Sequence, residues 1–211
     1  ESIAGLYPIT SGSVTFFPPE SDKPQELAGK DPMDIRKAGI AMSFVPEDRL
    51  GMGLVSNMDI IDNMMLRSYR RGRSAFLDRQ PPRELAERII EDLGVVTPNA
   101  TTPVRRLSGG NVQKVLVGRE ISADPTVLMV AYPVRGLDIN SSLTIYDLLN
   151  EQKKRGVAVI CVGEDLDVLL ELCDKILVLC GGKITGVVDA RKTTKEEIGL
   201  LMTKEEEESE A

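Results

Sequence analysis

The chain has 211 residues, which is enough for one domain with a sizeable core. Its net charge of −7 excludes a basic face for nucleic acid, and four Phe, four Tyr and no Trp leave little aromatic surface for stacking bases. The chain lacks histidine, which excludes every His-based catalytic scheme, and it has neither a membrane-length apolar run nor a signal-peptide pattern, so we expect a soluble, intracellular chain.

The first half of the chain alternates short strand-like and helix-like segments. Residues 1–6 resemble the end of a helix stopped by Gly5. The other expected elements are a strand at 13–17, a short helix at 34–37, a strand at 39–45, and helices at 59–69 and 83–93. A basic turn at 70–73 is expected to be solvated. The mostly helical stretch from about 50 to 122 indicates an inserted subdomain.

The second half begins with a helix expected over 109–122 and then alternates strands with helices. The expected elements are strands at 126–131, 157–162, 175–179 and 183–188, and helices at 141–154, 166–172 and 194–202. The apolar run 126–131 suits a buried parallel strand. Strands alternating with helices predict an α/β layered fold. Residues 204–211 are expected to form a charged, frayed tail.

Three cysteines, Cys161, Cys173 and Cys180, lie in or beside apolar segments. Their number is odd and their spacing matches no zinc motif. We therefore expect buried free thiols in a reducing compartment.

The most informative stretch is Leu107–Lys114, with the sequence LSGGNVQK. Two glycines after a serine let the backbone approach an anion closely. Ser108 is a natural N-cap for the helix that follows, and the free amides of Gly109 and Gly110 then lie at the positive end of its dipole. Such a helix start can hold a γ-phosphate, although an ordinary Ser-Gly-Gly turn before an amphipathic helix explains the three residues alone.

These eight residues resemble the signature motif of ABC-type ATPases, in the version typical of sugar and nucleoside importers. The chain as a whole resembles the C-terminal ATP-binding half of the two-domain ATPase subunit of such importers. Further matching segments are 3–14 (IAGLYPITSGSV), 45–49 (VPEDR), 53–55 (GLV), 133–138 (PVRGLD) and 173–179 (CDKILVL). The resemblance implies one α/β domain over 1–203, with an ABC-type, P-loop NTPase-like layered core and a mostly helical inserted subdomain.

The chain also departs from the family pattern, beginning with the G-x-x-x-x-G-K-[ST] phosphate loop, which is absent. Family spacing places that loop just before residue 1. Ala131 stands where the family has its Mg-associated Asp, and Tyr132 stands where it has the catalytic Glu. Without these carboxylates the site cannot hold Mg²⁺ or polarise water, so we expect no catalytic residue and no metal ligand in this half.

Glu164 stands where the family has its switch histidine. An ionised Glu164 repels a γ-phosphate by roughly 4 kcal/mol at about 4 Å near a protein surface. A simpler role for Glu164-Asp165, compatible with the first, is to cap the following helix. We call Ala131, Tyr132 and Glu164 the degenerate positions.

Two further residues, Asp138 and Glu47, are assigned by the resemblance. Asp138 has D-loop spacing, which implies a role at the seam between two domains, with a helix N-cap as the plainer alternative. Glu47 replaces the family's Gln but matches its PEDR variant, and is expected at the hinge between core and helical subdomain. Met58, Met64 and Met65 are expected to pack inside that subdomain rather than form a partner surface.

The implied function is that of a nucleotide-binding half of an importer ATPase for sugars or nucleosides. Residues Ser108, Gly109, Gly110 and Asn111 would complete an ATP site, with Mg²⁺, that belongs to the N-terminal half. No nucleotide is expected to bind tightly to this chain alone. The implied partners are that half and membrane permease subunits, at the cytoplasmic face of the membrane and without nucleic acid.

Two other functions compete with this one. A soluble ABC-type ATPase of DNA repair or translation would carry a coiled-coil insertion or a basic face, and the sequence has neither. A stand-alone pseudo-ATPase that acts only as an interaction or regulatory module remains open. An ATP-binding domain with an intact phosphate loop, encoded upstream, distinguishes the importer half from the stand-alone module.

Overall fold

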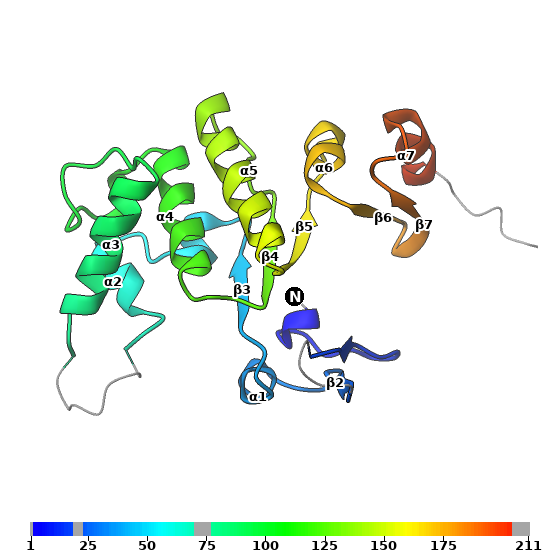
Figure 1. Cartoon of the computed structure of the whole chain (residues 1–211), viewed down its shortest axis with the longest axis horizontal. Helices are drawn as coiled ribbons and strands as arrows, with labels where there is room; N and C mark the ends of the chain where they lie inside the picture. Colours follow the sequence, from blue (N-terminus) through cyan, green and yellow to red (C-terminus); the bar gives the residue numbers. More distant parts are fainter. Residues whose placement is uncertain (1, 19–22, 70–76, 204–211) are drawn as a thin grey trace, which may run out of the picture.

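The computed structural model describes residues 2–18, 23–69 and 77–203 (Figure 1). The expected basic turn at 70–73 and the expected tail at 204–211 lie outside these ranges. Strands and helices alternate along the second half of the chain, as predicted, and the α/β layered fold is confirmed. Within the described residues no helix combines the length and apolarity needed to cross a membrane.

A three-stranded parallel sheet lies at the centre, in the order β3-β4-β5. Its strands are β3 (Met42–Val45), β4 (Val127–Ala131) and β5 (Ala158–Val162). The interior of β4 is buried, as expected for a strand flanked on both sides. In the register, Val130 pairs with both Val45 and Cys161, so the three carboxyl ends meet at one edge.

Helices α4 (Gly109–Ile121) and α5 (Ile139–Lys154) pack beside this sheet, and α6 (Leu166–Leu172) follows β5 (Figure 1). Leu116, Leu128 and Ile145 are fully buried where these helices meet the strands. The main apolar cluster therefore joins the sheet to the helix that begins with the LSGG turn.

The described residues from 49 to 121 form helices and turns, with one antiparallel bridge between Asp59 and Pro103. The elements are η2 (Arg49–Gly53), α2 (Ile60–Met65), α3 (Gln80–Asp92), η3 (Val104–Arg106) and α4. The prediction that the first of the two expected helices reaches residue 69 is wrong. The chain turns after Met65, and Arg67 instead extends to the buried Glu120.

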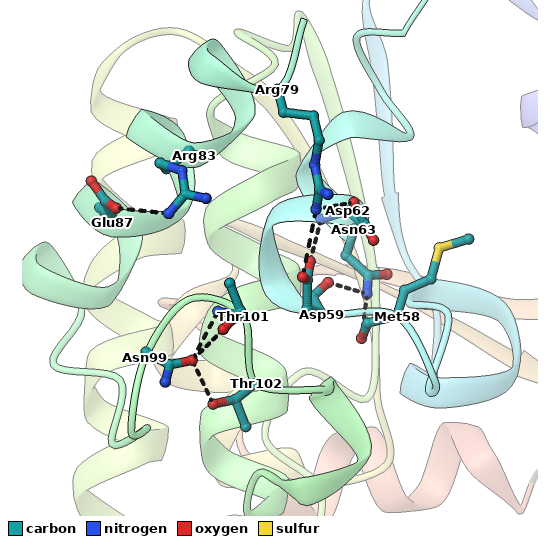
Figure 2. Close-up of polar contacts among 10 residues, drawn as sticks. All are labelled: Met58, Asp59, Asp62, Asn63, Arg79, Arg83, Glu87, Asn99, Thr101 and Thr102. Carbon is teal, nitrogen blue, oxygen red and sulfur yellow. Dashed lines mark hydrogen bonds and ion pairs between the residues drawn. The ribbon is translucent and has the colours of Figure 1, made fainter. Parts of the chain in front are cut away.

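A buried asparagine organises the start of this helical region (Figure 2). The Asn63 side chain is fully buried and donates to the carbonyls of Val55, Met58 and Asp59, at 3.2, 3.3 and 2.9 Å. Its Oδ1 accepts from the Val55 amide at 2.8 Å. Arg79, at the start of α3, pairs with Asp59 and Asp62, which ties α3 to α2. Met64 is buried and Met65 is half-buried, in line with the packing predicted for them, but Met58 lies before α2 and is 38 % exposed, so the prediction is wrong for Met58.

The two ends of the described chain carry small antiparallel pairs. Near the N-terminus η1 (Ser2–Ala4) precedes β1 (Thr15–Phe16), β2 (Gln25–Glu26) and α1 (Pro32–Lys37). The sequence did not predict β2. Residues 2–4 form a 3₁₀ turn that stops at Gly5, which has a φ of 75°. At the other end β6 (Lys175–Cys180) and β7 (Lys183–Asp189) form a hairpin followed by α7 (Lys195–Met202).

Candidate functional site

The LSGG turn begins α4 with the cap that the sequence predicts. Ser108 is the N-cap residue, and its Oγ accepts from the backbone and side-chain amides of Asn111 at 3.4 and 3.0 Å. Ser108 and Gly109 are exposed, while Asn111 is half-buried. Within the described residues the amides of Gly109 and Gly110 have no acceptor, as is normal in a first helical turn. Gly109 is at the surface, so its amide is available to an anion from outside the chain, whereas Gly110 is buried.

The two glycines have different surroundings. A Cβ atom at Gly110 would lie 2.5 Å from Ser141 Oγ and 3.3 Å from Asp138 Oδ2, whereas at Gly109 the nearest atom would be Arg49 Nη1 at 3.6 Å. Gly110 therefore allows the close approach of α4 to the start of α5. Gly109 borders open space and a guanidinium.

Asp138 is the N-cap of α5. Its carboxylate accepts from the Ser141 backbone amide at 2.9 Å and from the Ser141 hydroxyl at 2.7 Å, and these bonds lower its pKa. The plainer of its two predicted roles is confirmed. Because Asp138 also borders Gly110, it lies beside the LSGG turn.

Arg49 brings positive charge to the same turn. Its Nη2 donates to the Arg135 carbonyl at 2.5 Å, and its Nη1 lies near Gly109. Burial lowers the pKa of its guanidinium, which nevertheless remains a cation. The VPEDR segment contained this residue, but nothing in its spacing predicted that it would reach across to residue 109.

The degenerate positions Ala131 and Tyr132 lie at the carboxyl end of β4. Tyr132 has a φ of 49°, which is rare for a residue other than glycine, and its amide donates to the Val162 carbonyl at 2.7 Å. The backbone at this position is thus held by β5 in a strained conformation. Both side chains are half-buried.

Arg135 contacts three of the residues around this strand end. Its Nη1 lies 2.5 Å from Glu47 Oε1, its Nε lies 3.8 Å from Glu164 Oε1, and its guanidinium lies 5.4 Å from the centre of the Tyr132 ring. The sequence predicted Glu47, Tyr132 and Glu164 as separate positions. The structure brings all three side chains together around the Arg135 guanidinium, a group to which the sequence assigned no role.

The helix-capping role suggested for Glu164-Asp165 belongs to Asp165 alone. Its side chain accepts from the amides of Asp167 and Val168 at the start of α6. Glu164 is exposed and faces Arg135 instead. Its negative charge is therefore partly balanced, which weakens the repulsion expected toward a phosphate.

A hollow of about 520 Å³ lies at this edge of the sheet. Its lining includes Ala131, Glu47 and Asp48, with Phe44, Pro46, Met52 and Val162. No group of three carboxylate or thiol ligands that could hold a metal occurs among the described residues. At the β4 end itself, Ala131 and Tyr132 contribute no carboxylate, and the carboxylates that line the hollow are those of Glu47 and Asp48.

A buried ion network links α4 to the rest of the core. Glu120 is 1 % exposed, and its two oxygens pair with Arg119 at 3.0 Å and Arg67 at 3.2 Å. Arg119 also donates to the Gly53 carbonyl at 2.6 Å, and Glu120 accepts from the Phe44 amide. The helix that begins at the LSGG turn is in this way tied to β3 and to the turn after Asp48.

No protein-family model matches the chain, but curated relatives do. It is 35% identical over 205 residues to the ribose import ATP-binding protein RbsA 1 of Rubrobacter xylanophilus, covering 96% of this chain and 39% of that protein. It is 38% identical over 174 residues to the xylose import ATP-binding protein of Moorella thermoacetica, covering 82% and 34%. The guanosine import ATP-binding protein of Bacillus subtilis is 35% identical over 205 residues, with 96% and 39% covered. The chain thus spans about two fifths of the length of these relatives.

Solved structures show the same fold. A dimeric ATP-binding cassette in a post-hydrolysis state with ADP and Pi superimposes with a TM-score of 0.73 at 21% identity, covering 90% of this chain and 78% of that one. A nucleotide-free ATP-binding cassette from an ABC transporter gives 0.70 at 21% identity, covering 96% and 78%. The ABC-type, P-loop NTPase-like core predicted from the sequence is confirmed.

Proposed function

We propose that this chain, an ATP-binding-cassette domain homologous to sugar and nucleoside import ATP-binding subunits, is the second, C-terminal ATP-binding half of such a subunit. In this role it completes the ATP site of the N-terminal half rather than running a site of its own. Sugar or nucleoside import is the process served.

The exposed LSGG turn carries the proposal. Ser108 and Gly109 lie at the surface, the amides of Gly109 and Gly110 have no acceptor in the described chain, and Arg49 lies beside Gly109. These groups can donate to a γ-phosphate presented by a facing domain. Asp138 borders the turn and is the residue we assign to the seam with that domain.

The chain's own strand end supports no chemistry. Ala131 and Tyr132 supply no carboxylate for Mg²⁺ or water, and Glu47 and Glu164 are paired with Arg135. Bound ATP in the shared site would supply the phosphoryl group, with Mg²⁺ held by the other half. Residues Ser108, Gly109, Gly110 and Asn111 orient the phosphate and offset its charge, which is the main protein contribution in phosphoryl transfer.

Closing and opening of the two halves would move permease subunits docked near the helical region. We accordingly place the chain peripherally at the cytoplasmic face of the membrane, and we expect no tightly bound nucleotide on the chain alone. The tie between α4 and the turn after Asp48, through Arg119 and Gly53, supports movement of the signature and the Glu47 hinge as one body.

ATP-dependent association with the N-terminal half tests the proposal. The matched variants are Gly109→Glu and Gly199→Glu, because both glycines are helical and neither Cβ would meet an atom closer than 3.6 Å. Sedimentation should show that G109E abolishes association by placing a carboxylate against the phosphate, while G199E associates normally. Equal association of both variants contradicts the assignment of the LSGG turn.

A further inference from the structure

A second hollow, of about 450 Å³, lies among the helices and away from the strand ends. Figure 1 shows α4 between α3 and α5, and residues of all three helices line the hollow, which we call the three-helix groove. The end of α4 contributes Gly118, Ile121 and Ser122. Because the 13-residue α4 is about 20 Å long at 1.5 Å per residue, this groove is separate from the LSGG turn at the start of the helix.

Close packing of α3 on α4 forms the apolar part of the groove. A Cβ atom at Gly118 would lie 2.9 Å from Ile89 Cγ2 and 3.0 Å from Leu93 Cδ1, so this glycine lets the two helices approach closely. Ile89 and Leu93 lie one turn apart on α3, and Ile121 and Leu148 add apolar surface from α4 and α5. Leu93, Ile121 and Leu148 are only half-buried, so part of this apolar surface is open to contact.

Negative charge predominates around this apolar surface. The groove is lined by the exposed carboxylates of Asp92, Asp147 and Glu151 and by one exposed guanidinium, that of Arg88. Among the described residues none of the three carboxylates has an ion-pair or hydrogen-bond partner, and Arg88, one turn before Asp92, does not pair with it. Asp147 and Glu151 lie one turn apart on α5, a spacing at which like charges destabilise a helix.

We propose that the three-helix groove binds a basic amphipathic helix of another protein. Its apolar side chains fill the hollow, and its Lys or Arg side chains face Asp92, Asp147 and Glu151. Recognition of a helix in an apolar groove uses anchors at i, i+3, i+4 and i+7, which suits a hollow lined along three helices. The partner's cations supply the missing counter-charges and offset the repulsion between Asp147 and Glu151, whereas an acidic helix would add like charge.

The position of the groove determines what the partner contacts. A helix bound there touches α3, in the helical region, and α5, which packs beside the sheet, at the same time. It therefore holds these two parts of the chain together and leaves the LSGG turn uncovered. This inference does not depend on the function proposed for that turn.

Binding of a synthetic peptide to the full chain tests the proposal. The probe is an amphipathic peptide of about 18 residues, above the length at which isolated helices are marginal, with leucines at helical spacing and lysines on both edges. A second peptide carries glutamates in place of the lysines. The three cysteines are free, as predicted, but they are half-buried rather than buried, and none lines the groove. The fluorescent label is therefore placed on the peptide, and its anisotropy gives the Kd.

Two double variants test the charges. Asp147→Asn with Glu151→Gln removes two carboxylates from the groove. The matched control, Glu91→Gln with Glu171→Gln, removes two exposed helical carboxylates that do not line it. Circular dichroism checks that every variant is folded.

Two single variants test the hollow. Thr144→Trp fills it from α5, where Thr144 is part of the lining. The control is Leu143→Trp, which places the same side chain at the neighbouring position, where Leu143 is 52 % exposed and outside the lining. Sedimentation of the chain without peptide reports any self-association.

The expected result is saturable binding of the lysine peptide and none of the glutamate peptide. The Asp147/Glu151 variant and T144W should each raise the Kd at least about tenfold, and both controls should stay within about twofold. Absence of saturable binding of the lysine peptide overturns the proposal, as does equal binding of the glutamate peptide or equal weakening by groove and control variants. Self-association that T144W abolishes would assign the groove to a second copy of the chain, and it overturns the proposal as well.

Discussion

Arg135 Nη1 lies 2.5 Å from Glu47 Oε1, so a residue that follows β4 holds the residue that follows β3. The same guanidinium faces Glu164, after β5, and the ring of Tyr132. One cation thus joins the ends of all three parallel strands. We propose that these Arg135 contacts occupy the end of the sheet where Ala131 and Tyr132 offer no carboxylate for Mg²⁺.

The Arg135 contacts are solvent-exposed, which limits their effect on stability. Exposed ion pairs contribute about 0.2–1 kcal/mol, so Arg135→Ala should lower the free energy of unfolding by no more than about 1 kcal/mol. Denaturant unfolding measures this, with Arg155→Ala as control because Arg155 pairs with the exposed Asp124 at 3.2 Å. A decrease of several kcal/mol in the free energy of unfolding for R135A, but not for R155A, would show that the Arg135 contacts are a major source of stability.

Loss of the buried Glu120 network should destabilise the chain strongly, unlike loss of the exposed Arg135 contacts. Glu120→Ala leaves the buried Arg119 without its partner, and breaking a buried pair costs about 3–5 kcal/mol. Glu91→Ala, on the exposed face of α3, should change the free energy of unfolding by less than about 0.5 kcal/mol. Similar midpoints in urea for the two variants would contradict the burial of the network.

Substitution by alanine should destabilise the chain at Gly110 but not at Gly109. Gly110→Ala places a Cβ 2.5 Å from Ser141 Oγ, and such overpacking costs about 1–3 kcal/mol. Gly109→Ala meets only Arg49 at 3.6 Å and should be neutral or stabilising. Thermal unfolding compares them. Adding Ser141→Ala should recover part of the G110A loss, and a strictly additive double variant would argue against the contact.

Cys173 should show a characteristic pH dependence in thiol–disulfide exchange with a small aromatic disulfide. The facing groups are Cys161, Lys153 and Asp174, and the Cys161 hydrogen bond is the main cause of a pKa near 7. In a Cys180→Ala background, Cys161→Ala should return that pKa toward about 8.5. Because nucleophilicity rises with pKa, exchange should become about threefold slower at pH 7 but about fourfold faster at pH 9. Parallel pH profiles would contradict this environment for Cys173.

The sequence predicted those parts of the structure that local patterns determine. Ser108 and Asp138 cap α4 and α5 as expected, because a short polar side chain before an apolar-periodic run satisfies the first amides of a helix. The buried run 126–131 became the central strand β4. Ser108 and Gly109 of the LSGG turn lie at the surface, whereas Gly110 is buried.

Local sequence patterns did not predict the contacts between residues that are far apart in the chain. The Arg135 cluster joins residues from three strand ends, and no spacing along the chain reports such a meeting. The two-residue strand β2 depends on pairing with β1 rather than on its own apolar pattern. The sequence also did not predict the positive φ of Tyr132, since the hydrogen bond that accompanies it is to Val162 on a neighbouring strand.

Steady-state ATP hydrolysis, measured for the chain alone and after addition of the N-terminal ATP-binding half, separates donation by the LSGG turn from hydrolysis at the chain's own strand end. We expect background turnover for the chain alone. The chain should stimulate ATP hydrolysis by the added half, and this stimulation should be lost in Gly109→Glu and kept in Tyr132→Phe and Gly199→Glu. ATP turnover by the chain alone that disappears on mutating Tyr132 or Glu164 would show that the chain has a working site of its own. A stimulation unaffected by G109E would contradict donation by the LSGG turn.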